Sequence, residues 1–232
     1  MDFKIDIKKE LKLEVTPEQM HLFEIYYEFL ISYNQITNLT RITEINEVFY
    51  KHFYDSLSLV NVLDFNHIDS VCDMGAGAGF PSIPLKIMFP HLKITIVDSL
   101  NKRITFLTQL VEKLHLSDIS LYHQRIEEFA INHQNEFDVV TARALGHLSL
   151  ISEMGIPMVK NDHFFIAPKG QQAELEIEEA ENAIKYLGGQ IVNKKQFELP
   201  QGYGQRMNIL IKKTKHISGF PRTYTQMMNK PL

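Results

Sequence analysis

The sequence contains one cysteine, Cys72, and no apolar run as long as the roughly 18 residues that a membrane-spanning helix requires. A single cysteine excludes an intrachain disulfide and a zinc site built from cysteines, and it fits a reducing compartment. Residues 1–14 lack the apolar centre of a signal peptide. These absences predict a cytoplasmic protein with no membrane segment and no bound metal.

What is present is the composition of an ordinary globular protein. The 232 residues are 44% hydrophobic, which is enough for one sizeable core, and they contain no internal repeat or low-complexity tract. The net charge is −4, yet residues 193–232 carry eight lysines and arginines against one glutamate. A basic end of this kind indicates a polyanionic partner. The alternative is a lysine-rich edge strand that discourages aggregation.

The order of predicted elements indicates the fold class. A helix begins at Thr16, which with Pro17 and Gln19 forms a capping-box pattern, and a second helix covers residues 44–63. From residue 70 onward, strands alternate with helices. Strands are predicted at 70–74, 93–98, 119–123, 137–142, 163–168, 189–199 and 205–213, and helices at 81–89, 101–115, 148–159 and 173–186.

This alternation predicts an α/β protein whose mostly parallel, seven-stranded sheet is covered on both faces. The last two strands leave no room for a helix between them, so they form an antiparallel hairpin at one edge. We expect residues 1–66 to be a helical segment packed on the core, and residues 67–232 to be the main domain, with its basic carboxyl end.

A glycine-rich loop follows the first predicted strand. Gly75, Gly77 and Gly79 fall within five residues, which implies positive φ angles or close approach by a ligand. The dinucleotide fingerprint needs a glycine where Phe80 stands, and no Gly-Lys-Ser/Thr ending marks a P-loop. The pattern D-x-G-x-G-x-G instead suits a ligand without a pyrophosphate.

Asp98 ends the next predicted strand, where a carboxylate can accept hydrogen bonds from both hydroxyls of a ribose. Taken alone, the loop is equally well a simple turn and Asp98 a helix cap. Together, at this spacing within alternating strands and helices, they predict a site for S-adenosylmethionine.

Several longer motifs resemble one family. They are YNQITNLT (33–40), HFYDSL (52–57), DMGAGAGFPSIPL (73–85), VDSLNKRITFL (97–107), RIEEF (125–129), VVTARAL (139–145), APKG (167–170) and the terminal PR and KPL. Over nearly its whole length the chain resembles the bacterial ribosomal RNA small subunit methyltransferase G family, also called the glucose-inhibited division protein B family. The chain departs from the family pattern at Ser82, where a glycine is usual, and in its tail.

The resemblance implies a class I, Rossmann-like methyltransferase fold and methylation of N7 of a guanine in the decoding region of 16S ribosomal RNA. It also implies that the cofactor is bound by residues matching Gly75, Phe80, Ile126, Glu127 and Arg143. The expected partner is the small ribosomal subunit or its precursor, bound by a monomeric enzyme.

Guanine N7 carries an unprotonated lone pair, so its methylation needs no general base and depends on proximity and orientation. Arg143 is the candidate positioning residue, contacting the cofactor or guanine O6, with a structural ion pair as the alternative. His52 and Asp55 are candidates to line the site or, alternatively, structural residues. The candidates for RNA binding are Lys169, Arg206, Lys212, Lys213 and Arg222.

Other activities fit the sequence less well. Methylation of cytosine C5 needs a cysteine nucleophile, and Cys72 lies inside a predicted strand. Methylation of an exocyclic amine usually shows an Asp/Asn-Pro-Pro-aromatic motif where this chain has TARAL. A small-molecule methyltransferase and a catalytically silent RNA-binding module for ribosome assembly remain as alternatives.

Overall fold

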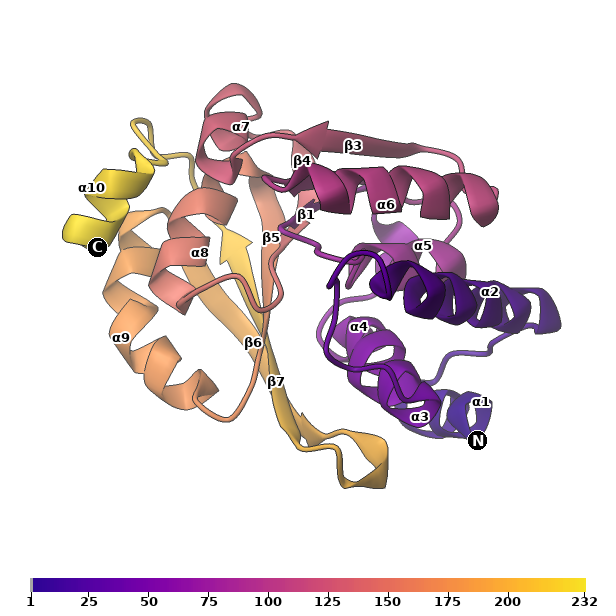
Figure 1. Cartoon of the computed structure of the whole chain (residues 1–232). Helices are drawn as coiled ribbons and strands as arrows, with labels where there is room; N and C mark the ends of the chain where they lie inside the picture. Colours follow the sequence, from indigo (N-terminus) through magenta and orange to yellow (C-terminus); the bar gives the residue numbers. More distant parts are fainter. Residues whose placement is uncertain (1) are drawn as a thin grey trace.

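The computed structural model describes residues 2–232, which form a seven-stranded sheet with helices on both faces (Figure 1). The strand order is β3-β2-β1-β4-β5-β7-β6. The first five strands pair in parallel, and β7 runs antiparallel to both β5 and β6. The strands are β1 (Ser70–Met74), β2 (Lys93–Asp98), β3 (Ile119–His123), β4 (Phe137–Thr141), β5 (Val159–Lys169), β6 (Gly189–Glu198) and β7 (Gln205–Lys213). The predicted fold class, including the edge hairpin, is confirmed.

Helices and helical turns make up the outer layers. The α-helices are α1 (Phe3–Asp6), α2 (Pro17–Asn34), α3 (Ile45–Val48), α4 (Asp55–Leu57), α5 (Ser82–Met88), α6 (Asn101–Lys113), α7 (Ile126–Asn132), α8 (Leu148–Gly155), α9 (Ala173–Tyr186) and α10 (Tyr224–Asn229). The π turns are η1 (Ile7–Leu11) and η2 (Phe49–Tyr54), and the 3-10 turns are η3 (Ser58–Asn61), η4 (Phe65–His67), η5 (Ile156–Met158) and η6 (Pro200–Gly202). Among residues 2–232, no helix combines the length and apolar character needed to cross a membrane.

The pleat of the strands divides the apolar side chains between two cores. Val71, Val139 and Leu210 enter the core shared with α2, α5 and α6, whereas their neighbours Cys72 and Val140 enter the core beneath α7, α8 and α9. Successive residues of a strand point to opposite faces, which explains this division. The first core also contains the buried aromatic side chains of the amino-terminal helices, so residues 3–65 share it with the sheet.

The helical run that follows the capped helix α2 is less regular than predicted. The sequence predicted one helix over residues 44–63, and the chain is indeed helical from Ile45 to Asn61, but a π turn and a 3-10 turn interrupt it. Side chains from this run tie it to distant parts of the chain. The ring of Phe49 packs edge-on against Phe3 at 5.0 Å, and Asn208 of β7 donates a hydrogen bond to the carbonyl of Ser58 at 2.8 Å. These contacts place the run beside the carboxyl ends of the strands.

Candidate active site at the carboxyl ends of the strands

The glycine loop between β1 and α5 has the positive φ angles that its composition predicts. The values are +68° at Gly75, +62° at Gly77 and +98° at Gly79. A Cβ atom at Gly79 would lie 2.7 Å from Ile83 and 2.8 Å from the Tyr26 hydroxyl oxygen, so that position is closed to larger residues. A Cβ at Gly77 would meet nothing within 4 Å. The loop therefore packs tightly at one end and presents bare backbone to open space in its middle.

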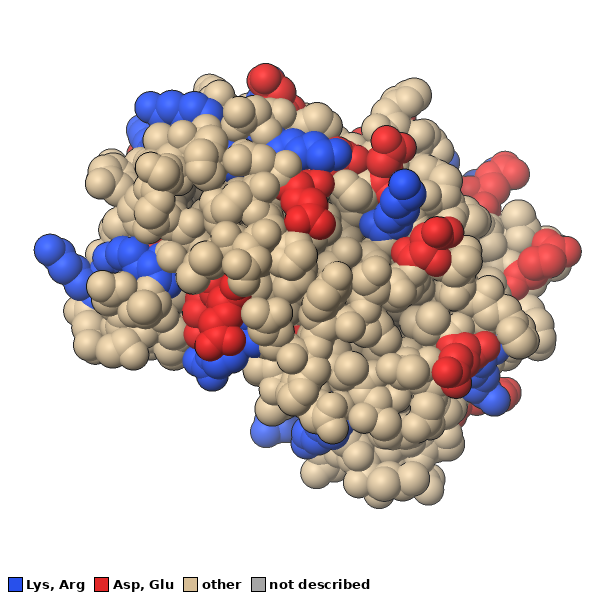
Figure 2. All heavy atoms as spheres, turned by 90° about the horizontal axis from the view of Figure 1, so that it is seen from above, with Lys and Arg blue, Asp and Glu red and all other residues tan. Residues whose placement is uncertain are grey.

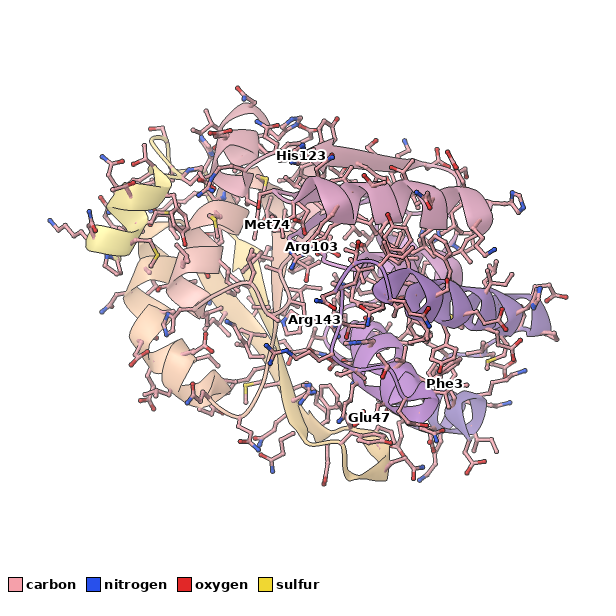
Figure 3. All side chains as sticks on the ribbon, viewed as in Figure 1. Phe3, Glu47, Met74, Arg103, His123 and Arg143 are labelled. Carbon is pink, nitrogen blue, oxygen red and sulfur yellow. The ribbon has the colours of Figure 1, made fainter. Side chains whose placement is uncertain are left out.

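A cavity of about 180 Å³ lies over this loop. Its wall consists of Leu39, Thr40, His52, Gly75, Ala76, Gly77, Ala78, Phe80, Arg103, Arg143, Ala144 and Leu145. These residues come from the glycine loop itself, from the loop after α2, from the π turn η2, from the start of α6 and from the segment after β4. Figure 3 shows Arg103 and Arg143 between the central strands and the amino-terminal helices. We call this space the cofactor cavity.

Asp98 lies at the end of β2, as predicted, but it is 1% exposed and its carboxylate already accepts three hydrogen bonds. Oδ1 accepts a hydrogen bond from the backbone N–H of Leu100 at 2.9 Å. Oδ2 accepts from the backbone N–H of Gly77 at 3.3 Å and from Nη1 of Arg103 at 3.0 Å. The first of the Oδ2 bonds joins the glycine loop directly to the strand-end carboxylate.

Ile126 and Glu127 lie in the first turn of α7, just beyond the end of β3. Gln124 donates its backbone N–H to the carbonyl of Asp98 at 3.2 Å, so this segment lies against the strand-end carboxylate residue. Ile126 is buried, and Glu127 pairs with Arg125 at 2.8 Å. Neither side chain lines the cofactor cavity in this arrangement, although both belong to the helix that follows this segment.

Asp73, the acidic residue before the glycine loop, is fully buried. Its Oδ2 accepts from the backbone N–H of Ser82 at 3.1 Å, whereas its Oδ1 has no hydrogen-bond partner among the described residues. Thr141, its register partner on β4, likewise has an unpartnered buried hydroxyl. Burial disfavours the charged carboxylate and raises the pKa of Asp73 to about 7.

We expect the Asp73→Asn variant to be more stable than the wild type at pH 8 but not at pH 4. The folded protein holds the Asp73 proton up to about pH 7, whereas the unfolded chain releases it near 3.8, so this group lowers stability as pH rises between those values. The asparagine side chain does not ionise, so the variant avoids this loss of folding free energy, which is up to about 4 kcal/mol. Urea unfolding of both proteins at the two pH values measures the difference. A pH-independent difference would contradict this account of the carboxyl.

Arg143 is the centre of a buried hydrogen-bond network. Its Nη1 lies 3.0 Å from Oδ2 of Asp55 and 3.2 Å from the carbonyl of Lys51, and its Nη2 lies 3.1 Å from Nδ1 of His52. Arg206 reaches Oδ1 of Asp55 with Nε at 3.2 Å. The structure thus joins four residues that the sequence singled out separately.

The protonation of His52 follows from this network. Burial and the positive charge of Arg143 lower the pKa of His52 to about 3, so the imidazole is neutral at physiological pH. Arg143 has only donors, so Nδ1 of His52 is the acceptor. Nε2 then carries the proton and donates it to Oγ1 of Thr40 at 3.0 Å. An imidazole fixed in this way orients its neighbours and does not serve as a base.

Phe80 lies under these groups and connects them to the glycine loop. The His52 ring stacks on Phe80 at 4.5 Å between centroids, and the guanidinium of Arg143 lies 5.1 Å from the same ring. Asn34, at the end of α2, holds the loop that carries Thr40 by accepting from the backbone N–H groups of Leu39 and Thr40 at 2.7 and 3.0 Å. The YNQITNLT motif thereby builds one wall of the cofactor cavity.

A second pocket of about 460 Å³ adjoins the cofactor cavity. The two share His52, Arg143 and Ala144 in their walls. The second pocket contains four basic side chains and two acidic ones, namely Lys51, Arg143, Lys169 and Arg206 against Asp55 and Glu176. We call it the basic pocket. A ligand in one space would contact side chains that also face the other.

Comparison with known proteins assigns the chain to a family. The family model described as rRNA small subunit methyltransferase G matches residues 19–203. The chain belongs to this family. It is 46% identical over 222 residues to "Ribosomal RNA small subunit methyltransferase G" of Acholeplasma laidlawii, covering 96% of each chain. It is 49% identical over 216 residues to the Listeria welshimeri protein of the same name, covering 92% of this chain and 91% of that one.

Solved structures with lower identity show the same fold. TYW2 of M. jannaschii in complex with AdoMet superposes with a TM-score of 0.56 at 12% identity, covering 70% of this chain and 76% of that one. The ribosomal protein L11 methylase of Lactobacillus delbrueckii subsp. bulgaricus gives a TM-score of 0.51 at 17% identity, covering 69% and 77%. The predicted class I methyltransferase fold is confirmed.

In this member of the methyltransferase G family, three of the basic residues predicted to bind RNA already pair with acidic residues of the protein. Lys169 bonds Glu176 at 2.7 Å and the carbonyl of Gly146 at 2.6 Å, and its side chain is 9% exposed. Arg222 pairs with the buried Glu153 at 2.6 Å. Lys212 pairs with Asp162 on the surface at 2.8 Å. The face in Figure 2 shows acidic and basic groups interspersed, without one continuous basic field.

The prediction that Lys213 contacts RNA is wrong. Lys213 is 1% exposed, and its ammonium donates to Oδ1 of Asn135 at 2.7 Å and to the carbonyls of Pro157 and Val159 at 2.9 and 2.8 Å. Since successive residues of a strand point to opposite faces, Lys212 reaches the surface and Lys213 points inward. Lys213 anchors the end of β7 to the turn before β5.

We expect Lys213→Met to lower the free energy of unfolding by at least about 2 kcal/mol, because the two buried carbonyls of Pro157 and Val159 and the side chain of Asn135 would lose a donor. Lys212→Ala is the matched control. It removes only an exposed ion pair, so its stability should stay within about 0.5 kcal/mol of the wild type. Denaturant unfolding of the three proteins measures both effects. Equal stability of the two variants would contradict the anchoring role.

Proposed function

We propose that this protein transfers the methyl group of S-adenosylmethionine to N7 of a guanine in 16S ribosomal RNA of the small subunit. The observation that carries the proposal is the pair of adjoining spaces, one lined by the glycine loop and one by basic side chains, with His52, Arg143 and Ala144 in the walls of both. Membership in the rRNA small subunit methyltransferase G family supports the choice of ribosomal RNA.

The residues around the cofactor cavity fit S-adenosylmethionine. The bare backbone at Gly77 leaves room for the methionine part, and the buried Asp73 carboxyl just before the loop has an unpartnered oxygen, Oδ1, that a polar group of the ligand can satisfy. Asp98 at the strand end suits the ribose. The residues that would hold the cofactor are Gly75, Gly77, Gly79, Phe80, Asp98, Ile126, Glu127 and Arg143. When bound, the cofactor supplies an electrophilic methyl group on a positively charged sulfur.

The basic pocket is the proposed place for the guanine. Its volume of about 460 Å³ lies within the roughly 300–1,000 Å³ typical of ligand pockets. An extruded base is commonly held in such a pocket by stacking and edge contacts, while Arg and Lys hold its phosphates. Lys51 and Arg206, each about one quarter exposed, are the basic groups of the pocket most open to solvent and are proposed phosphate contacts.

The chain's own residues act by orientation. N7 of guanine needs no proton removed, which agrees with a site where His52 is neutral and its Nδ1 already accepts from Arg143. Arg143 is held on three sides by Lys51, Asp55 and His52, so it presents a fixed guanidinium between the two spaces. Holding the reacting atoms at roughly 3–3.5 Å is then the main source of rate.

Deletion and reconstitution test the substrate. In a bacterial strain lacking the gene, N7-methylguanosine is mapped in the 16S RNA by borohydride and aniline cleavage, and purified protein is added to its undermethylated 30S particles. We expect one cleavage site to disappear in the deletion strain and to return on addition of protein. Free guanosine should be a poor substrate, because RNA enzymes recognise shape and context.

The alternatives give different outcomes. Retention of every N7-methylguanosine site in the deletion strain would refute the RNA substrate and favour a small-molecule methyltransferase. Failure of the purified protein to bind S-adenosylmethionine in calorimetry would favour a silent RNA-binding module.

We further propose that the enzyme acts in the cytoplasm, as a monomer, on the small subunit or its precursor.

A further inference from the structure

Asp98 cannot accept hydrogen bonds from both ribose hydroxyls in the observed arrangement, because three of the roughly four acceptor positions of its carboxylate are already used. It is 1% exposed, and its two oxygens already accept three hydrogen bonds. Two of the donors, the N–H groups of Gly77 and Leu100, are backbone and belong to the loop that shapes the site. The third donor is the guanidinium of Arg103, which belongs to a long and partly exposed side chain. Arg103 is therefore the partner that a ribose can replace.

Arg103 is placed for such an exchange. It lies in the first turn of α6, its side chain is 34% exposed, and it forms part of the wall of the cofactor cavity. Within the described residues, Asp98 is the one hydrogen-bond partner of the Arg103 side chain. A guanidinium held by a single partner at a solvent-facing wall loses only that contact when it swings outward.

The size of the cavity also requires an opening movement. About 180 Å³ is below the roughly 300 Å³ at the lower end of ligand pockets, and S-adenosylmethionine combines a nucleoside with an amino acid. Retraction of Arg103 would both enlarge the cavity and remove one hydrogen bond from Oδ2 of Asp98. When Arg103 leaves, the buried carboxylate keeps its two backbone donors but loses one hydrogen bond, which is costly at a buried site unless another donor replaces it. The ribose hydroxyls would take over that role from Arg103.

We propose that Arg103 and the ribose of the cofactor compete for Asp98, so that the ion pair between Arg103 and Asp98 limits the affinity for cofactor. This inference rests on the proposed function, since it assumes a nucleoside cofactor at Asp98. If Arg103 competes with the ribose, removing Arg103 should tighten cofactor binding. If Arg103 instead supported the site, removing it should weaken binding.

Isothermal titration calorimetry with S-adenosylhomocysteine tests the competition. We expect Arg103→Ala to lower the dissociation constant by about two- to fivefold, as removal of a partly exposed ion pair implies. Lys102→Ala is the matched control, because it removes the same charge from the neighbouring exposed position and should leave the constant unchanged. Thermal unfolding of both variants verifies that they are folded.

A ligand without ribose hydroxyls separates competition from other effects. With 2′,3′-dideoxy-S-adenosylhomocysteine, the Arg103→Ala variant should gain less affinity over the wild type than it does with S-adenosylhomocysteine, because the enlarged cavity helps both ligands but only the ribose hydroxyls replace the lost donor on Asp98. Weaker or unchanged binding of S-adenosylhomocysteine by Arg103→Ala would overturn the proposal, as would an equal gain for both ligands. If the wild type binds neither compound, the proposed cofactor itself is wrong, which is a different result.

Discussion

The Gly77→Arg variant is expected to fold and to bind no S-adenosylmethionine. Gly77 has a φ of +62°, and a Cβ there would meet nothing within 4 Å, so a long side chain would extend into the cofactor cavity. The strained backbone costs about 1–2 kcal/mol, whereas the occupied cavity excludes the ligand. Calorimetric titration with S-adenosylmethionine gives the affinity, and circular dichroism with thermal unfolding shows whether the variant is folded.

Gly202→Arg is the matched control for this experiment. Gly202 has a φ of +71° and also has nothing within 4 Å of an added Cβ, but it lies in the turn between β6 and β7 and lines neither the cofactor cavity nor the basic pocket. It carries the same backbone strain and the same added charge. We expect wild-type affinity in Gly202→Arg. Wild-type affinity in Gly77→Arg would refute the proposed cofactor site.

The Arg143→Ala variant is expected to lose methyl transfer by roughly 100-fold, which is the cost of misplacing reacting groups by about 1 Å. Removing the guanidinium frees Nδ1 of His52 and leaves Asp55 with Arg206 as its basic partner. Both changes loosen the wall between the cofactor cavity and the basic pocket. Single-turnover transfer to undermethylated 30S particles at saturating cofactor measures the loss.

Stability and binding have to be separated from rate in this variant, because breaking a buried ion pair costs about 3–5 kcal/mol. Arg143→Lys keeps the positive charge beside Asp55, and it should retain the fold while recovering little activity, since one ammonium nitrogen replaces the two nitrogens, Nη1 and Nη2, that contact the partners of Arg143 from separate positions. An unchanged single-turnover rate in Arg143→Ala would show that the residue only stabilises the fold.

The fold was predictable because local patterns and tertiary structure agree. Alternating strands and helices leave few possible topologies, and α9 has the predicted bounds, residues 173–186. The sequence does not predict the helices at residues 126–132 and 224–229, and it places residues 3–11 in the helical segment 1–66 without giving them helix bounds. These are short, and packing on neighbouring elements stabilises them more than their own propensity does.

The sequence predicts those parts of the candidate site whose positions follow from the spacing of residues along the chain. It does not predict contacts that depend on how individual side chains pack. His52 and Asp55 are three residues apart, which puts them on one face of a helix. The glycine loop and Asp98 could likewise be placed at one edge of the sheet, because each lies at the end of a predicted strand. The contact between Asp98 and Arg103 depends on which way one side chain turns. The burial of Lys213 follows from the two-residue period of a strand, since Lys212 and Lys213 face opposite sides.

The strand order has a consequence for how the protein is made. β6 precedes β7 in the chain but pairs only with β7, and β7 pairs with β5. On the ribosome, the edge of β5 therefore stays unpaired until about residue 213 has left the exit tunnel. An unpaired strand edge is prone to associate with other chains, so the nascent protein is most vulnerable to aggregation late in translation. Arg206 arrives with the same strand, so Asp55 gains its second arginine only when the sheet is complete.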